Sequence, residues 1–392
     1  MTSSVPVRAG MAHCSELSRR WALATSDGVR ADGSVAPSTV AAVGSEVWTV
    51  ADDEIVVTDG AEVLVLQGLE PGTEVDVPGV GPVRTLERPP GERLATVCTV
   101  NDVHFGEVEC GRIESLPEVG PVLSVAPGEE PYPEVMNRAA CSAITEVVER
   151  GAAPWAVVAK GDLTATGSAA EHEAFLACYG GAFGDRLVAV RGNHDAAAGL
   201  SFASGSRIVE LPGIVVILLD TVIPGGHRGW VDDGQLAQMD EVARQARLDD
   251  RVVLVLGHHH PWDPASRSRP DAYFGIHPDA SERLVEVVAR RPAIVATAAG
   301  HTHRNRVRRF PATGTVPHAE VASTKDFPGS WAEYRVHEGG VLQVHRRLVS
   351  PEALAWSERC RAMVGGLYPA YAAGGPADRC LAIHRRAVDS PA

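Results

Sequence analysis

The sequence predicts an α/β layered fold with mixed sheets, preceded by a small β-rich region. Three observations lead to this prediction. Short β-like runs separated by turn residues fill residues 45–92. From residue 94 onward, apolar strand-like runs alternate with helical patterns. Residues 306–349 are again rich in strands. Alternating strands and helices followed by hairpins are typical of helices packed on mixed sheets.

The β-rich region is predicted from runs at residues 46–50, 54–58, 62–67 and 73–77, with turns at 59–60 and 71–73. Its exit is the proline-rich RPPGE, residues 88–92, which reads as a linker. A fibronectin-like module, an unrelated β cap and an extension of the main sheet all remain open for this region.

The main domain is predicted to begin with a strand at 94–100. A helix at 133–151 follows, with Pro133 in its first turn and Gly151 as its stop. Ser168 and Glu171 form a capping box that opens the next helix, which ends near Gly180. The remaining predicted elements are strands 155–159, 187–190, 213–219, 252–256, 293–299, 306–310, 318–323, 332–338 and 341–349, and helices 234–247 and 279–290.

A turn at Gly339-Gly340 is expected to join the last two strands. Ser350-Pro351-Glu352 is a plausible helix start, so one or two helices are expected after it. Four parts are therefore predicted: an N-terminal extension (1–44), a small β-rich region with its linker (45–92), the main domain (93–349) and a C-terminal helical extension (350–392).

Composition limits the classes of partner and compartment. The chain has 392 residues, of which 45% are hydrophobic, and its net charge is -14. An acidic protein repels phosphate backbones, so no nucleic acid polymer is expected as a partner. Seven scattered cysteines without a CxxC pair favour a reduced, cytoplasmic protein. The longest apolar run, 213–223, is interrupted by Asp220 and too short to span a bilayer, so no membrane association is expected. The sequence leaves a homo-oligomer open.

Polar motifs follow five of the predicted strands. They are Asn101-Asp102-Val103-His104, Gly161-Asp162, Gly192-Asn193-His194-Asp195, Gly257-His258-His259-His260-Pro261 and Gly300-His301-Thr302-His303. Because ligands in layered α/β folds bind at the carboxyl ends of strands, we expect these side chains to converge. Each motif alone is weak, but their recurrence after successive strands indicates one functional site.

The donor types indicate a metal centre. Carboxylates, an amide and imidazoles suit zinc, manganese or iron better than copper(I) or an iron–sulfur cluster. The set exceeds the three protein groups of one catalytic zinc. Two ions sharing a bridging carboxylate would use it well, as in phosphatases and nucleases.

The order D-x-H, GD, GNHD, H-x-P, GH-x-H over residues 93–347 resembles the calcineurin-like metallophosphoesterase superfamily. It is most similar to bacterial class III cyclic-nucleotide phosphodiesterases, which also have segments like 218–236 and 323–331. The resemblance implies a four-layer α/β/β/α sandwich of two mixed sheets.

The resemblance also implies a ligand set. Asp102, His104 and His303 would hold one ion, Asn193, His259 and His301 the second, and Asp162 would bridge them. His259 is chosen because the family's ligand stands two residues before the proline. His258 is the alternative, because a one-residue slip at the strand end would exchange the two. The ions would be divalent or mixed-valence manganese, iron or zinc.

His194 and Asp195 are the predicted catalytic residues. In the family the equivalent of His194 faces the substrate and assists the leaving oxygen. Asp195 is expected to accept a hydrogen bond from His194, which would fix its tautomer and favour its charged form.

The implied function is hydrolysis of a small-molecule phosphate ester. We expect phosphodiesters such as 3',5'-cyclic nucleotides, attacked by a metal-bridging hydroxide while His194 assists the leaving group. The alternatives are a phosphomonoesterase of the same superfamily and a non-catalytic, metal-stabilised binding protein. A metallo-β-lactamase site in HHHPWD (258–263) fails, because Asp263 is one place late and no histidine follows it.

Overall fold

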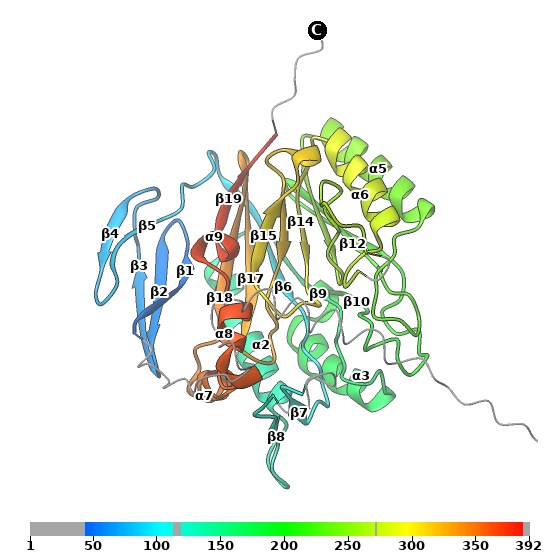
Figure 1. Cartoon of the computed structure of the whole chain (residues 1–392). Coiled ribbons are helices and arrows are strands. Elements are labelled where there is room, and N and C mark those ends of the chain that lie inside the picture. The colour runs from blue at the N-terminus through cyan, green and yellow to red at the C-terminus, as the bar shows by residue number, and fades with distance from the viewer. Residues whose placement is uncertain (1–43, 113–118, 271–272, 387–392) are drawn as a thin grey trace, which may run out of the picture.

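Two six-stranded mixed sheets packed face to face form the centre of the molecule, and helices cover both outer faces (Figure 1). The computed structural model describes residues 44–112, 119–270 and 273–386. The first sheet has the order β10 (Leu187–Val190), β9 (Trp155–Lys160), β6 (Arg93–Val100), β17 (Ser330–His337), β18 (Gly340–Arg347) and β19 (Leu381–His384). The second has the order β11 (Arg207–Leu211), β12 (Ile214–Leu219), β13 (Val252–Gly257), β14 (Ile294–Ala299), β16 (Pro317–Glu320) and β15 (Arg306–Arg309).

Each sheet contains a parallel block with antiparallel strands beside it. In the first sheet β10, β9 and β6 run parallel, and β17, β18 and β19 pair antiparallel. In the second sheet β12, β13, β14 and β16 run parallel, and β11 and β15 are antiparallel edges. The parallel blocks carry their carboxyl ends, and therefore the polar motifs, to one side of the molecule.

Side chains of the buried strands point alternately to the two faces of their sheet, so each sheet packs against the other sheet and against helices. On β12, Ile214, Val216 and Leu218 pack between the two sheets, with side chains such as Val97 and Tyr334 of the first sheet. Their neighbours Val215, Ile217 and Leu219 face the helices instead. Successive side chains of a strand point to opposite faces, so a strand buried on both faces is apolar throughout.

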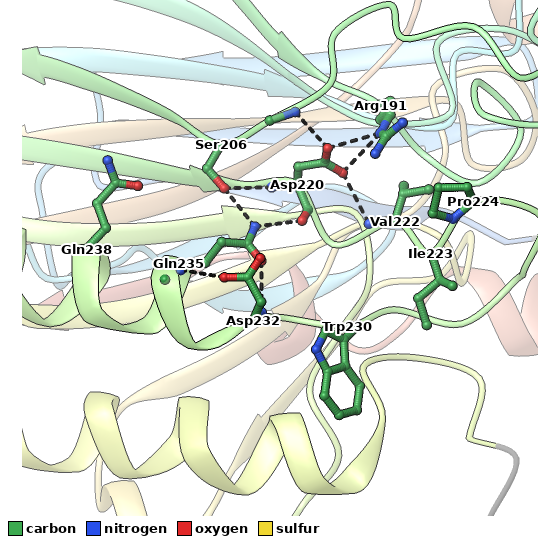
Figure 2. A pocket seen from close by; sticks show the side chains of 12 residues that line it. Arg191, Ser206, Asp220, Val222, Ile223, Pro224, Trp230, Asp232, Gln235 and Gln238 are labelled. Atoms are coloured by element: carbon green, nitrogen blue, oxygen red, sulfur yellow. Dashed lines mark hydrogen bonds and ion pairs between the residues drawn. The ribbon is translucent and has the colours of Figure 1, made fainter.

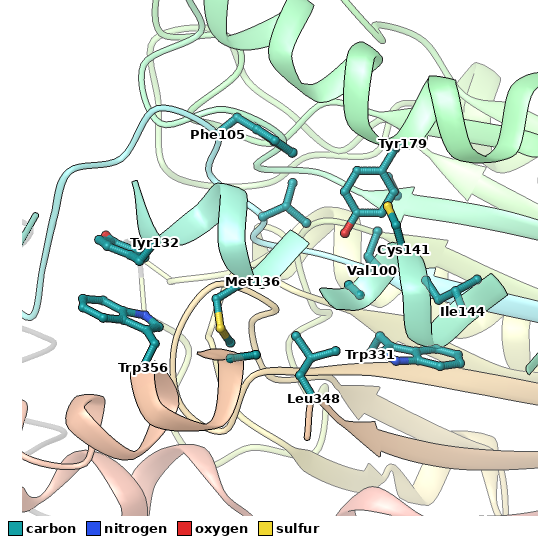
Figure 3. Packing of buried hydrophobic residues seen from close by; sticks show 14 of the residues in the cluster. Val100, Phe105, Tyr132, Met136, Cys141, Ile144, Tyr179, Trp331, Leu348 and Trp356 are labelled. Atoms are coloured by element: carbon teal, nitrogen blue, oxygen red, sulfur yellow. The ribbon is translucent and has the colours of Figure 1, made fainter. Parts of the chain in front are cut away.

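The helices complete a four-layer sandwich, as predicted. The first sheet is covered by α2 (Tyr132–Arg150), α3 (Ala169–Phe175) and α7 (Pro351–Cys360), whose apolar side chains form one cluster with β6, β9 and β17 (Figure 3). The second is covered by α5 (Asp233–Leu248) and α6 (Pro278–Arg290). The short elements are β7 (Glu109–Cys110), β8 (Leu123–Ser124), η1 (Leu176–Gly180), α4 (Gly181–Phe183), η2 (Gly184–Arg186), η3 (Pro311–Thr313), η4 (Val364–Gly366), α8 (Tyr368–Ala372) and α9 (Pro376–Arg379).

The N-terminal β-rich region forms its own antiparallel sheet, β1 (Glu46–Val50), β2 (Glu54–Asp59) and β3 (Glu62–Gln67), and a hairpin, β4 (Glu74–Val77) and β5 (Gly81–Arg84). Buried contacts attach it to the main domain. Trp48 belongs to the cluster beneath the first sheet, and the Thr49 hydroxyl donates to the carbonyl of His345 at 2.7 Å. Arg335 of β17 bonds Asp53 at 2.7 Å.

Most predicted elements are present, and the differences are local. The capping box at Ser168 and Glu171 is confirmed, but α3 ends at Phe175 and a π-helical turn follows to Gly180. The turn between β17 and β18 is Glu338-Gly339, one residue earlier than predicted, because His337 pairs with Gly340. Strands β11 and β19 were not predicted, since each is short and has little alternation.

The predicted N-terminal extension, apart from Gly44, lies outside the described residues. Within the parts of the chain that the structure describes, no helix is both long enough and apolar enough to span a membrane.

Candidate metal centre

The five polar motifs meet where β6, β9, β10, β13 and β14 end. Backbone hydrogen bonds join their loops directly. The amide of His104 donates to the carbonyl of Asp162 at 3.1 Å, and the amide of Gly300 donates to the carbonyl of His258 at 3.0 Å. Between the two sheets, the amide of His301 donates to the Asp102 Oδ2 atom at 3.0 Å, so the site is assembled across both sheets, as the convergence of strand ends predicts.

Five of the predicted ligands adopt a left-handed backbone conformation. The φ angles are +50° at Asp102, +45° at His104, +49° at Asp162, +67° at His301 and +53° at His303. Such conformations cost free energy in residues other than glycine, and they concentrate at functional sites. The chain turns sharply at the end of each strand, which aims the side chains into one space.

Two glycines allow ligands from different strands to approach closely. A Cβ atom at Gly192 would lie 2.1 Å from the Asp162 Oδ1 atom, and one at Gly300 would lie 2.6 Å from the Asp102 Oδ2 atom. Both contacts are shorter than any van der Waals contact. Gly192 and Gly300 thus each make room for a carboxylate delivered by another strand.

One half of the site surrounds the His258 imidazole. Its Nε2 atom lies 3.2 Å from the Asp162 Oδ2 atom, 3.2 Å from the Asn193 Oδ1 atom and 3.2 Å from the His301 Nδ1 atom. The His258 Nδ1 atom is 3.0 Å from the carbonyl of Lys160, which accepts its hydrogen. That bond leaves the Nε2 lone pair directed at the other three groups.

His259, the residue predicted as the ligand, occupies a different position. Its Nδ1 atom is 2.8 Å from the hydroxyl of Thr221, and its ring centroid is 4.4 Å from that of His301. Because β13 ends at Gly257, His258 is the first residue after the strand. The ligand atoms of His258, His259 and His301 all lie within 4.8 Å of one another, and the contacts to Asp162 and Asn193 are made by His258. His260 points away and is 2.9 Å from the Tyr273 hydroxyl.

The other half contains Asp102, His104 and His303. The His303 Nε2 atom is 3.4 Å from the Asp102 Oδ1 atom, and the His104 Nε2 atom is 3.5 Å from the Asp162 Oδ2 atom. Each ring is held from behind by a carboxylate. The His104 Nδ1 atom is 2.7 Å from Glu107, and the His303 Nδ1 atom is 3.3 Å from Asp326. A carboxylate behind an imidazole fixes its tautomer and raises its basicity as a ligand.

The site is buried and strongly negative. Burial alone would raise the pKa of Asp162, but the imidazoles of His258 and His194 hold that pKa well below its ordinary value. Burial lowers the pKa of His104, yet Glu107 and Asp162 overcome it and raise that pKa to about 9. Negative charge that favours a proton on a ring nitrogen also favours a metal cation at the same place.

These residues fit metal ions. Their ligand atoms form four groups in which all members lie within 4.8 Å of one another. The groups are His258, His259 and His301; Asp102, His104 and His303; His104, Asp162 and His194; and Asp102, Asp162 and His258. Asp102, His104, Asp162 and His258 each occur in two groups, so these four side chains lie at the centre of the site. Carboxylates and imidazoles in such a cluster suit divalent transition metals.

The predicted partnership of His194 and Asp195 differs from the structure. The His194 Nδ1 atom is 2.7 Å from the carbonyl of Ala165. Asp195 is fully buried and accepts hydrogen bonds from the amides of Leu163, Thr164 and Gly192 and from the Thr164 hydroxyl, all within 3.0 Å. A carboxylate saturated by backbone donors is held away from the ring, so Asp195 joins two loops and Ala165 orients His194.

A cavity of about 550 Å³ opens in front of these groups. The half-buried His194 lines it, and so do Phe274, which stacks on His301 at 4.0 Å, and His227. Tyr368 and Tyr371 close the cavity from the C-terminal segment. Sequence reasoning did not assign roles to Glu107, Lys325 and Asp326 on its wall, although the segment containing the last two resembles the family.

A second cavity, of about 720 Å³, lies beside the start of the Gly192–Asp195 loop (Figure 2). There the Arg191 guanidinium donates to Asp220 at 3.0 Å, and the Gln235 amide donates to the carbonyl of Asp220 at 2.8 Å. This network ties the loop to β12 and α5.

Comparison with known proteins gives one family. Residues 95–305, more than half of the chain, match the model described as calcineurin-like phosphoesterase. This match confirms the predicted resemblance.

Two curated proteins are similar over part of their length. A cAMP/cGMP dual specificity phosphodiesterase of Mycobacterium tuberculosis is 32% identical over 135 residues, which are 31% of this chain and 41% of that protein. A Rhodococcus erythropolis protein named "Probable cyclic nucleotide phosphodiesterase" is 29% identical over 180 residues, which are 43% of this chain and 57% of that protein. The chain thus spans about half the length of the curated relatives it matches.

Among solved structures, a dimetal phosphatase of Danio rerio superposes with a TM-score of 0.51 at 14% identity, covering 65% of this chain and 97% of that structure. At that identity the likeness supports the fold alone, and it confirms the predicted sandwich.

Proposed function

Because the chain belongs to the calcineurin-like phosphoesterase family, and is therefore a phosphoric ester hydrolase, we propose that it hydrolyses phosphodiesters at a centre of two divalent metal ions. The proposed substrate class is 3',5'-cyclic nucleotides. The similarity to phosphodiesterases named for these substrates supports this class. The cavity of about 550 Å³ suits a small molecule.

The proposed ligands divide into two sets. Asp102, His104 and His303 hold the first ion, Asn193, His258 and His301 hold the second, and Asp162 is shared. The observation that carries this assignment is the His258 Nε2 atom, 3.2 Å from one ligand atom of each of Asp162, Asn193 and His301. Ligand atoms of one metal ion lie roughly 3 Å apart when each bond is about 2.0–2.2 Å long.

When bound, two ions screen the negative charge of a diester and lower the pKa of the attacking water. The protein's own residues then position the substrate and move a proton. His194 faces the cavity, and its Nδ1 atom donates to the carbonyl of Ala165. A proton passed to the leaving oxygen must therefore be carried on the Nε2 atom of His194. Such help contributes about 10²–10⁴-fold to a rate.

The proposed organisation places catalysis in residues 93–349, with the β-rich region and the C-terminal segment packed against this domain. The described cysteines are free thiols, which supports a reducing, cytoplasmic location.

The test is a substrate panel on one preparation of the full chain reconstituted with Mn²⁺, Zn²⁺ or Fe²⁺. It contains cAMP, cGMP, bis(p-nitrophenyl) phosphate and the monoester p-nitrophenyl phosphate. We expect turnover of the diesters that a chelator removes and added metal restores. Turnover of the monoester alone would overturn the diester assignment, and bound metal without turnover of any ester would overturn catalysis.

A further inference from the structure

We infer that Lys325 is a positioning residue for the first metal ion, because its ammonium group joins the two carboxylates that orient His104 and His303. This inference rests on the proposed two-ion centre and deepens it. It assigns a role to a residue that lies outside the stretch matched by the family model.

Two carboxylates contact the Nδ1 atoms of the histidines proposed for the first ion. Glu107 lies 2.7 Å from the His104 Nδ1 atom, and Asp326 lies 3.3 Å from the His303 Nδ1 atom. Both histidines of the first ion thus depend on a side chain that could rotate. Because these carboxylates contact the Nδ1 atoms, a shift of either one would turn the Nε2 atom of its ring away from the first ion.

The ammonium group of Lys325 lies between these two carboxylates. The Lys325 Nζ atom is 2.6 Å from the Glu107 Oε1 atom and 3.2 Å from the Asp326 Oδ2 atom. The side chains of Lys325 and Asp326 are 4% and 2% exposed, so the contact is shielded from water. In such surroundings two neighbouring carboxylates repel strongly unless a cation lies between them.

Hydrogen bonds from aromatic side chains hold Lys325 and the two carboxylates in place. The Tyr368 hydroxyl donates to the Asp326 Oδ1 atom at 2.9 Å, and the Trp356 indole donates to the carbonyl of Lys325 at 3.0 Å. Trp356 stacks on Tyr132 with ring centroids 4.1 Å apart (Figure 3), and the Tyr132 hydroxyl bonds Glu107. The C-terminal segment therefore supports the first ion's ligands through Lys325 and Asp326.

Charge and positioning predict opposite effects of removing the ammonium. Loss of a positive charge near a cation site would, by charge alone, strengthen metal binding. Loss of the bridge lets Glu107 and Asp326 separate and releases the two rings, which weakens binding. The sign of the change in metal affinity therefore decides between the two roles.

The experiment measures Mn²⁺ binding isotherms of the purified full chain, with Lys325→Met placed in three backgrounds. In the wild-type background we expect one ion to bind about 10-fold more weakly and the other to be unchanged, the lower end of the effect of losing the partner of a ligand, because both carboxylates remain. His258→Ala retains the first ion, and there Lys325→Met should weaken the remaining ion by the same factor. His303→Ala retains the second ion, and there Lys325→Met should change nothing.

Arg335→Met is the matched control. Arg335 is a buried cation that bonds Asp53 and Glu333 but none of the proposed ligands, so both Mn²⁺ affinities should stay at their wild-type values. If Lys325→Met does not fold, Tyr368→Phe replaces it, and we expect a smaller loss confined to the same ion.

Three results would overturn the inference: tighter binding of the first ion, unchanged binding of both ions, or equal weakening in the His258→Ala and His303→Ala backgrounds. Fewer than two ions on the wild-type chain would instead overturn the two-ion centre, and the inference with it. The isotherm of the unmodified protein thus separates the two failures.

Discussion

The two halves of the centre each contain two imidazoles and share Asp162, but they are supported in different ways. In the first half, carboxylates hold the Nδ1 atoms of His104 and His303, and Lys325 joins these carboxylates. In the second half, the backbone carbonyl of Lys160 holds His258, and the ring of Phe274 packs on His301. One half depends on side-chain charge, and the other on strand register and packing.

This difference predicts which substitutions each half tolerates. A carbonyl at the end of β9 is fixed by the sheet, so the second half should tolerate changes in distant side chains. A carboxylate is fixed only by what bonds it, so the first half should respond to substitutions that touch neither metal nor substrate. Asp162 contacts both halves, so its substitution should weaken the binding of both ions.

The largest effect is expected from Asp162→Asn. The substitution keeps the shape of the side chain but removes the charge that both halves share, so both ions should bind weakly. Turnover should fall by more than the roughly 10²–10⁴-fold that proton transfer contributes. Metal analysis and diester turnover of the same preparation measure this. Retention of two ions would show that Asp162 is not the shared ligand.

His194→Ala should remove catalysis while sparing both halves. The ring faces the cavity and is anchored to the carbonyl of Ala165, so its loss should leave the metal content at two ions. Turnover should fall about 10²–10⁴-fold. The comparison with Asp162→Asn is made at equal metal concentration. Loss of both ions in His194→Ala would contradict its assignment as a proton donor.

The variants His258→Ala and His259→Ala test which of the two neighbouring histidines binds the second ion. We expect His258→Ala to lose the second ion, because its Nε2 atom is central to that half. His259→Ala should keep it, because the contacts to Asp162 and Asn193 in this half are made by His258. Metal stoichiometry of the two proteins decides the matter, and the opposite pattern would restore His259 as the ligand.

The smallest effect on the centre is expected from Arg335→Met. This variant removes a buried cation that contributes to packing and contacts none of the proposed metal ligands. Arg335 attaches the N-terminal region through Asp52 and Asp53, while Arg93 and Arg346 still bond Glu333 in its absence. The free energy of unfolding should fall by roughly 1–3 kcal/mol, the cost of leaving a buried polar group without its partner. Urea unfolding measures the change. A loss of bound metal would show that the N-terminal region is coupled to the site.

Much of the site was predictable because its ligands follow strands. Apolar runs ending in polar motifs located Asp102, Asp162 and Asn193, and strand ends of a layered fold meet. The proposed choice of His258 over His259 depends on where β13 stops. A pattern of three consecutive histidines cannot reveal that residue, and the pairing of β13 with its neighbours does.

The supporting groups were harder to predict, because long-range contacts define them. Lys325 meets Glu107 across 218 positions of sequence, and Tyr368 meets Asp326 across 42. The role of Asp195 was predicted incorrectly because adjacency to His194 in sequence was taken as contact. In the structure the amides of Leu163, Thr164 and Gly192 bond that carboxylate instead.

The most direct test titrates the metal-free full chain with Mn²⁺ and measures bound metal and turnover of bis(p-nitrophenyl) phosphate at every point. If catalysis needs two ions that share Asp162, turnover should rise steeply only as the second equivalent binds, and the metal-free chain should show no turnover. Full turnover after one equivalent, or turnover that persists in excess chelator, would contradict a two-ion centre built around Asp162.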